Sequence, residues 1–377
     1  MLKITGVKTF ALHHKVPTSS GPSTFYYRSR SALLVRIVTD EGLVGWGETA
    51  VLSGVRAIIE EQLAPLLMGS NPMAYRSLWH SMWGPNFGNG MALGGVDMAL
   101  NDLRGKFLGL PLAELFGGRM RQRVAAYASA MNYIEDKNPL EHYPAEATEL
   151  VERGFRALKM RLGGQCLRAD VAVAEAVRSA VGPNVKLMAD GNGAYTMHTA
   201  IQMGRELERL SFYWFEEPLP QSTPDYAGYE VLTEKLDIAI AAGEGLTSRG
   251  MFKEVVARRA MDIVQPDISL CGGIAEAIFV AELARLWGMQ CMPHCWGGGL
   301  VIAATVHLLS LMPNASWSRY TEEPMLEIDM QENPFRVELL TEPMSFSDGF
   351  IAVPEGHGLG VTIDEDKVEF YSRSDLG

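Results

Sequence analysis

Three acidic side chains, each at or near the end of a short apolar run, constrain the fold of this chain more than any other feature. They are Asp190 in KLMADGN, Glu216 in YWFEEPL and Glu244 in IAIAAGE. Short apolar runs of this kind, bounded by glycine or proline, are typical of buried strands. A strand and its return helix take about 30 residues in a (β/α)₈ barrel. The spacing therefore predicts three carboxylates at the same level of three successive parallel strands.

A carboxylate at the end of a buried strand is unfavourable unless a cation compensates its charge. Three hard oxygen ligands suit Mg²⁺, so we expect Asp190, Glu216 and Glu244 to bind this ion. The alternative is three solvated acids in ordinary loops, which is less consistent with three acids in register. Asn192 shares a face with Asp190 and could hold a ligand or substrate oxygen, whereas strand alternation turns Glu217 to the opposite side, in a supporting role.

Strand-like and helix-like segments alternate from about Val124 onward, which indicates an α/β barrel with parallel strands. The seven candidate strands are VAAYAS (124–129), ALKMRLG (157–163), KLMADGN (186–192), YWFEEPL (213–219), IAIAAGE (238–244), DIVQPDI (262–268) and QCMPHCW (290–296). The eighth is the least clear, and we assign it to Ser316–Tyr320.

The chain before this alternation contains strands followed by helices, as in a separate α+β domain. Ala32–Val38 and Leu43–Glu48 form a predicted hairpin, and Val96–Phe107 a predicted helix. Lys15–Arg30 has the composition of a loop, either on the surface or as a lid. We expect a capping domain over 1–122, the barrel over 123–330, and a tail, 331–377, that packs back on the capping domain.

Composition narrows the function. The net charge of −12 argues against nucleic acid or an anionic membrane as partner. No apolar run could span a bilayer and the N-terminus lacks a signal peptide, so we expect a cytoplasmic protein. The four cysteines suggest no disulfide framework. Cys291, His294 and Cys295 resemble a zinc cluster, but strand alternation turns the histidine away from both thiols, and we favour buried structural cysteines.

Four further side chains provide bases and cations near the predicted metal. Lys159 and Arg161 lie two apart on one strand and share a face. Asp267 and His294 lie on successive strands, and a carboxylate beside a histidine sets its tautomer and strengthens it as a base. Removal of the proton α to a bound carboxylate places a second negative charge there, which a metal and cationic donors would neutralise. The sequence therefore predicts proton abstraction from a small carboxylic acid.

The motifs K-x-[K/R], D-x-N, EEP, GE, QPD with Gly272-Gly273, and PH-x-W resemble, in this order, those of the enolase superfamily, mandelate racemase subgroup. The segment GGVDMALNDLRGKFLGLPLAELFGG is similar to the end of that family's capping domain. PHCWGGG, EPMLEIDMQENPFR and EGHGLGV look closest to its acid-sugar members, the dehydratases and galactarolactone cycloisomerase-like enzymes.

The resemblance implies a (β/α)₇β barrel whose capping domain is completed by the C-terminal tail, and a homo-oligomer. It implies Asp190, Glu216 and Glu244 as Mg²⁺ ligands and His294–Asp267 as a catalytic dyad. Segments near 17–27 and 47–54 become specificity elements, with Tyr26 and Trp296 as substrate contacts. Glu327 becomes the acid that hydrogen-bonds the substrate carboxylate, with Glu322 and Glu323 as rivals.

Arg161 departs from the family pattern, in which a second lysine often acts as a base. Arginine stays protonated and is suited to clamping a carboxylate or hydroxyl. Lys159 keeps the role of neutralising developing charge. We therefore expect a dehydratase of aldonates or aldarates that uses His294 alone. The alternatives are an isomerase on the same scaffold, either a lactone cycloisomerase or an epimerase, and a catalytically silent metal-binding protein.

Overall fold

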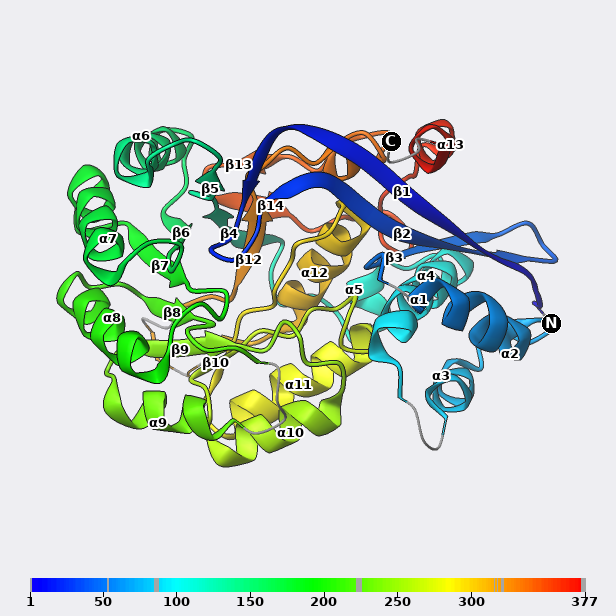
Figure 1. Cartoon of the computed structure of the whole chain (residues 1–377). Helices are drawn as coiled ribbons and strands as arrows, with labels where there is room; N and C mark the ends of the chain where they lie inside the picture. The colour runs from blue at the N-terminus through cyan, green and yellow to red at the C-terminus, as the bar shows by residue number, and fades with distance from the viewer. Residues whose placement is uncertain are drawn as a thin grey trace.

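An antiparallel sheet forms the N-terminal part of the computed structural model, which describes residues 2–52, 54–84, 88–221, 226–314, 316, 318–319 and 322–373. Its strand order is β3-β2-β1-β5 (Figure 1). The bounds are β1 Ile4–Gly21, β2 Tyr27–Thr39, β3 Val44–Thr49 and β5 Tyr133–Ile134. The predicted hairpin is confirmed, since β2 and β3 pair around Gly42, whose φ of 79° suits the turn.

Helices α1 to α5 follow this sheet. They are α1 Val55–Ala57, η1 Ile58–Leu63, α2 Ala64–Leu67, α3 Tyr75–Trp83, α4 Gly90–Leu108 and α5 Leu112–Leu115. The predicted helix over 96–107 is confirmed within α4, which Asn89 caps at its start and Gly109 ends in a left-handed conformation. Helix α4 packs so closely on β3 that a Cβ at Gly47 would lie 2.0 Å from the Gly95 carbonyl oxygen, so this crossing requires glycine.

Eight parallel strands form the second part, in the order β12-β4-β6-β7-β8-β9-β10-β11. They are β4 Arg123–Ser129, β6 Ala157–Arg161, β7 Lys186–Asp190, β8 Trp214–Glu216, β9 Ala239–Ala242, β10 Ile263–Val264, β11 Gln290–Cys291 and β12 Met325–Asp329. The connecting helices are α6 Pro139–Glu152, α7 Leu167–Val181, α8 Met197–Arg209, α9 Ala227–Lys235, α10 Arg249–Arg258, α11 Ile274–Leu286 and α12 Gly299–Leu311. The predicted alternation is therefore present, with helices around the strands (Figure 1).

A buried cluster fills the space between these strands. Its members come from all eight strands or the residue that follows one: Tyr127, Ala157, Met188, Trp214, Ala241, Ile263, Met292 and Met325. Over the described ranges, no β ladder joins β11 to β12; the Met325 backbone N–H donates to Met292 Sδ at 3.3 Å instead. Side-chain packing, rather than a hydrogen-bonded ladder, thus links β11 and β12.

The assignment of the eighth strand to Ser316–Tyr320 is wrong. Ser316, Ser318 and Arg319 form bends and a turn, while Trp317 and Tyr320 lie outside the described residues. The strand is β12, which pairs in parallel with β4 from Met325↔Ala125 to Asp329↔Ser129. Its sequence MLEID carries two acids; Lys159 compensates the charge of Glu327, and Arg30 and Arg336 compensate that of Asp329.

The segment Lys15–Arg30, predicted as a loop, is mostly a two-stranded ribbon. β1 and β2 pair as far as Lys15↔Ser29 and Ser20↔Tyr27, and β5 adds to its end through Gly21↔Tyr133. The Ser23 hydroxyl at the tip donates to the Gly191 carbonyl at 2.9 Å. The polar composition that suggested a loop reflects a ribbon with one face in solvent.

The tail after β12 contacts both parts of the molecule. It contains η2 Pro334–Arg336, β13 Phe346–Ser347, β14 Phe350–Ala352 and α13 Glu365–Arg373. β14 pairs antiparallel with β4, whereas α13 lies against β1, where Tyr371 meets the His14 ring edge-on at 5.9 Å. The domain boundaries at 122/123 and 330/331 stay predictions, as do the homo-oligomer and the cytoplasmic location.

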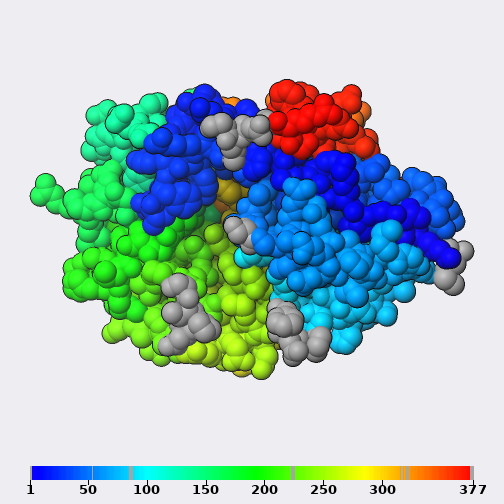
Figure 2. Space-filling view, turned by 45° about the vertical axis from the view of Figure 1, so that its right-hand side comes forward, coloured from blue at the N-terminus to red at the C-terminus, as the bar shows by residue number. Residues whose placement is uncertain are grey.

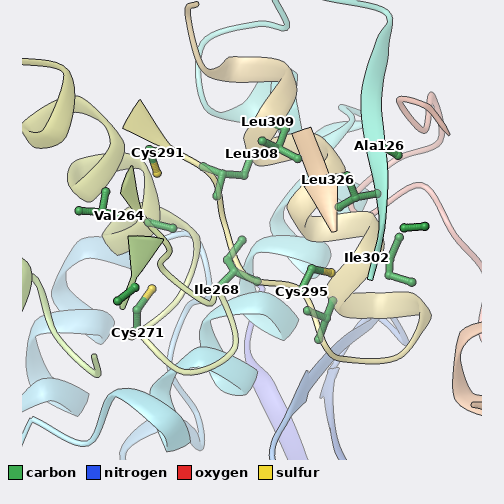
Figure 3. Close-up of a cluster of buried hydrophobic side chains, with 14 of the residues drawn as sticks. Ala126, Val264, Ile268, Cys271, Cys291, Cys295, Ile302, Leu308, Leu309 and Leu326 are labelled. Atoms are coloured by element: carbon green, nitrogen blue, oxygen red, sulfur yellow. The ribbon is translucent and has the colours of Figure 1, made fainter. Parts of the chain in front are cut away.

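The cysteines near His294 are buried among apolar side chains and do not form a cluster. Cys271, Cys291 and Cys295 lie apart from one another, each beside residues such as Val264, Ile268 or Ile302 (Figure 3). Burial raises the pKa of the Cys295 thiol. These are structural thiols, as expected. Among the described residues no helix is long and apolar enough to cross a membrane.

His307 on α12 connects three parts of the chain. Its Nδ1 accepts from the Ala113 backbone N–H of α5 at 3.3 Å, and its Nε2 lies 3.2 Å from the Leu359 carbonyl of the tail. Burial lowers its pKa from 6.5 to about 4. The neutral ring therefore stabilises the fold above pH 6.5, and this stability is lost as the pH falls through about 4.

We predict that His307→Gln flattens this pH dependence. Between pH 7 and pH 4 the free energy of unfolding of the wild type should fall by about 3 kcal/mol more than that of the variant. Urea denaturation at several pH values measures the difference. The exposed His198 of α8 offers the control, His198→Gln, which should follow the wild type. Parallel curves for the wild type and His307→Gln would show that His307 makes no such contribution.

Candidate active site

The carboxyl ends of the parallel strands bring the predicted residues to one level. Arg161 of β6 pairs with Asp190 of β7, and Asp190 pairs with Glu216 of β8. The ends of parallel strands are where active sites form in barrels of this type. Figure 2 shows this side of the molecule, where the surface is hollowed between the dark-blue N-terminal ribbon and the green and yellow segments.

Lys159 is the centre of the acidic cluster. Its fully buried ammonium contacts Glu216 Oε1 closely, and lies 2.8 Å from Glu327 Oε1 and 3.5 Å from Asp190 Oδ2. Burial by itself lowers the pKa of Lys159, but these three carboxylates outweigh it and raise the pKa above its usual value. Lys159 thus stays protonated and provides a permanent positive charge among the acids.

Arg161 forms a second buried cation beside Asp190. Its Nη1 contacts Asp190 Oδ2 and lies 3.5 Å from Asn192 Oδ1, and its Nη2 lies 3.4 Å from the Ser129 hydroxyl. Its guanidinium lies over the Trp296 ring, 5.0 Å from the centroid. Nearby carboxylates, Asp190 above all, outweigh burial and hold the pKa of Arg161 above its usual value, so it cannot act as a base.

His294 and Asp267 are in direct contact. His294 Nδ1 lies 2.7 Å from Asp267 Oδ2, while Asp267 Oδ1 accepts from the backbone N–H and the hydroxyl of Ser269. The ring is therefore held with Nδ1 toward Asp267 and Nε2 toward Glu244, whose Oε2 is 3.2 Å away. Burial lowers the pKa of His294, but Glu244 and Asp267 outweigh it and raise the pKa to about 10.

The remaining predicted residues occupy different surroundings. Asn192, whose φ is 46°, donates its backbone N–H to Asp190 Oδ1 at 2.9 Å. Glu327 is fully buried; its Oε2 accepts from the Cys295 N–H at 3.1 Å. Burial raises its pKa, but Lys159 and His294 outweigh this and lower it to about 2. Its rival Glu322 instead pairs with Lys186 near the surface.

Glu217 departs from the direction that strand alternation predicted, and the substrate contact predicted for Tyr26 stays a prediction. Glu217 does not follow strand alternation, because its φ of 39° breaks the strand directly after Glu216. Burial raises its pKa, the charges of Glu244 and Asp190 raise it further, and its carboxylate accepts a hydrogen bond from Gln221 Nε2. Tyr26 is 43% exposed; its neighbour Tyr27 instead stacks on Trp296, with ring centroids 6.4 Å apart.

Sequence reasoning missed Arg30, and it gave no individual role to Tyr27, within the segment 17–27, or to Gln265, within the QPD motif. Tyr27 and Arg30 line a cavity of about 370 Å³ together with His294, Asp267 and Trp296. Gln265 Nε2 donates to Glu216 Oε2 at 2.8 Å. A signal for Gln265 existed, since it lies two residues before Asp267 and therefore on the same face of the strand predicted over 262–268.

The fit to a metal ion depends on these carboxylates. Within the residues that the structure describes, no three His, Cys, Asp or Glu side chains lie close enough together to hold an ion. Asp190 and Glu216 nevertheless converge on one cation, the Lys159 ammonium, and Glu244 follows the next strand, β9, and contacts the His294 ring. All three offer the hard oxygen atoms that Mg²⁺ prefers, so the donor set fits this ion.

Two family models match the chain. Residues 142–367 match the enolase C-terminal domain-like model, and residues 7–117 match the N-terminal domain of mandelate racemase and muconate lactonizing enzyme. D-galactarolactone cycloisomerase of Agrobacterium fabrum is 33% identical, covering 99% of this chain and 100% of the relative. Arabinonate dehydratase of Saccharolobus solfataricus is also 33% identical, covering 89% of each chain.

Solved structures agree with these matches. The 3,6-anhydro-D-galactonate cycloisomerase of Zobellia galactanivorans superposes with a TM-score of 0.86 at 32% identity, covering 98% of this chain and 99% of that one. A racemase of Streptomyces coelicolor with bound magnesium has a TM-score of 0.85 at 28% identity, with the same coverage. The chain therefore belongs to the mandelate racemase subgroup of the enolase superfamily, whose N-terminal domain and C-terminal barrel it shares.

Proposed function

We propose that this protein is a Mg²⁺-dependent dehydratase of a sugar acid, an aldonate or aldarate. The observation that carries the proposal is the His294–Asp267 pair at 2.7 Å, in a cavity next to the buried cluster of Lys159 and three carboxylates. This arrangement places a base beside charges suited to a carboxylate substrate. The relatives at about 33% identity include an acid-sugar dehydratase, which supports the same reaction class.

Glu244 is the strongest of the charges that raise the pKa of His294, and this charge would be neutralised when Glu244 holds Mg²⁺. His294 would then be neutral and take the proton from the α-carbon of the substrate. Asp267 accepts a hydrogen bond from Nδ1–H, so Nε2 is the nitrogen that receives the proton. Lys159 provides the fixed positive charge nearest to the place where the second negative charge develops. The β-hydroxyl then leaves as water, taking one proton from the protonated His294 or a bound water, and the resulting enol tautomerises to a 2-keto-3-deoxy acid.

Asp190, Glu216 and Glu244 would hold Mg²⁺. When bound, the ion supplies positive charge that makes the α-proton of a carboxylate more acidic. Arg161 and Asn192 lie next to Asp190, and they would orient the substrate through their N–H groups. Glu327, whose low pKa keeps it ionised beside Lys159, would position that lysine; a hydrogen bond from Glu327 to the substrate carboxylate would require its protonated form.

An isomerase on the same scaffold is the second candidate. The observation in its favour is the full-length match to a galactarolactone cycloisomerase, together with the match to an anhydrogalactonate cycloisomerase structure. Arg161, which cannot exchange a proton, argues against epimerisation by two bases but not against lactone isomerisation. Dehydration and isomerisation would both begin with removal of the α-proton. They would differ in the group that then leaves the β-carbon.

The test is a product screen with Mg²⁺ over stereoisomers of aldonates, aldarates and their lactones. We expect a 2-keto acid from one or a few stereoisomers, detected with semicarbazide and by proton NMR. A ring-opened or ring-closed product, formed without a keto acid, would favour the isomerase. Full metal loading with no reaction on any compound would favour the catalytically silent metal-binding protein.

A further inference from the structure

A second cavity adjoins the one that contains His294. It has a volume of about 280 Å³, lies between the β1–β2 ribbon and the carboxyl end of β4, and shares Tyr27 and Arg30 with the first cavity. The position of this cavity, beside the proposed reaction centre rather than remote from it, suits the part of a substrate that extends away from the reacting carbon.

Asn132 is a buried amide that faces this cavity without a partner. The residue is 3% exposed, and among the described residues neither its Nδ2 nor its Oδ1 has a hydrogen-bond partner. A buried polar group without a partner is unfavourable unless a ligand or water satisfies it. The backbone next to it is tied to the reaction centre, because the Met131 carbonyl accepts from the Arg161 backbone N–H at 3.2 Å.

The loop that presents Asn132 is held in an uncommon conformation. Met131 has φ of 50°, which a side chain other than glycine seldom adopts, and its N–H donates to Glu146 Oε1 at 3.1 Å. Strained positions of this kind persist where the surrounding structure enforces them, often at binding sites. Glu146 itself lines the same cavity, so one acid both holds the loop and faces the space that Asn132 faces.

The charges around the cavity favour a neutral ligand. Glu146 and Glu332 line it, and the one cation among its lining residues, Arg30, is already paired with Asp329 at 2.9 Å and donates to the Glu332 carbonyl at 3.1 Å. A carboxylate entering this space would meet two acids and no free cation. Hydroxyl groups, in contrast, both donate and accept, as the amide of Asn132 requires.

We propose that the substrate is a monocarboxylic aldonate rather than an aldarate, and that Asn132 binds a hydroxyl of its neutral tail. This inference rests on the proposed function, and it assigns Asn132 and Glu146 to substrate selection, away from the reacting carbon. The carboxylate end lies at the acidic cluster, and the polyhydroxyl end extends past Tyr27 and Arg30 into the second cavity.

The first test compares six-carbon aldonates with aldarates of the same configuration on the wild-type protein with Mg²⁺. We expect kcat/KM to be higher for the aldonate by about tenfold or more. Equal values, or a preference for the aldarate, would overturn the inference. If no compound is dehydrated or exchanges its α-proton, both the proposed function and this inference are wrong. If compounds are dehydrated at rates that do not depend on whether the far end is a hydroxyl or a carboxylate, only this inference is wrong.

The second test uses Asn132→Ala and Glu146→Gln. Asn132→Ala should lower kcat/KM for a six-carbon aldonate about tenfold relative to a four-carbon one, mainly through KM, because a hydroxyl loses its partner. Glu146→Gln keeps an oxygen that accepts from Met131 N–H, and it should narrow the preference for the aldonate over the aldarate. An unchanged ratio of six- to four-carbon substrates in a folded Asn132→Ala protein would contradict the role of Asn132. Should Asn132→Ala not fold, the wild-type comparison still decides the substrate class.

Discussion

Replacing His294 with asparagine is expected to lower kcat at least about 10³-fold, while the protein stays folded and still binds Mg²⁺. General bases of this kind contribute roughly 10² to 10⁴-fold, and Asp267 then holds a side chain that cannot take a proton. The asparagine amide can still donate a hydrogen bond to Asp267, and the hydroxyl and N–H of Ser269 also donate to this carboxylate. The loss of turnover should therefore reflect the missing base and not unfolding. Steady-state turnover and the melting temperature, measured together, separate the two causes.

The matched control is His198→Asn. His198 is exposed on α8, so the same substitution there should leave both turnover and melting temperature near those of the wild type. A His294→Asn protein that keeps more than about a tenth of the wild-type kcat would exclude His294 as the base.

Replacing Glu216 with glutamine is expected to weaken Mg²⁺ binding at least about 100-fold and to abolish turnover. The change removes one of three negatively charged ligands. Even residues that only hydrogen-bond to a metal ligand change metal affinity by about 10 to 100-fold when they are mutated. Lys159 would keep Glu327 at 2.8 Å and Asp190 at 3.5 Å, so the buried ammonium retains partners and the fold should survive. Calorimetric titration with MgCl₂ measures the affinity directly.

Glu234→Gln provides the control for this measurement, because Glu234 is exposed on the outer helix α9. Its affinity for Mg²⁺ should match that of the wild type. Undiminished Mg²⁺ binding by Glu216→Gln would show that the ion, if it binds, is held elsewhere.

The sequence predicted the strand ends well because each combines an apolar run with an acid. Arg161, Asp190 and Glu216 lie side by side in the register that their spacing implied. Spacing could not reveal that Lys159 contacts three carboxylates at once, since that depends on side-chain directions in the buried interior. It also missed β12, because MLEID has two acids in five residues and resembles a surface segment until Lys159 and Arg30 are known to pair with them.

Side chains at loops and ribbon ends were the least predictable. Tyr26 and Tyr27 are neighbours, and which of them turns toward the cavity depends on the strand register. The pairing of Ser20 with Tyr27 sets this register, and amino-acid composition does not reveal it. Glu217 and Met131 both have positive φ. The rule that side chains alternate between the two faces of a strand therefore does not apply to them. Asn132 follows one of these positions, which explains why the unpartnered amide became visible only in three dimensions.

The measurement that tests the central claim most directly is exchange of the α-proton in D₂O. Wild-type protein with Mg²⁺ would be incubated with a panel of sugar acids, and proton NMR would follow loss of the C2 signal and entry of deuterium into the product. The account predicts loss of the C2 proton, deuterium at C3 of a 2-keto-3-deoxy acid, and neither event with His294→Asn. Two results would contradict this account. One is loss of the C2 signal at the wild-type rate in His294→Asn, and the other is a 2-keto-3-deoxy acid that carries no solvent deuterium at C3.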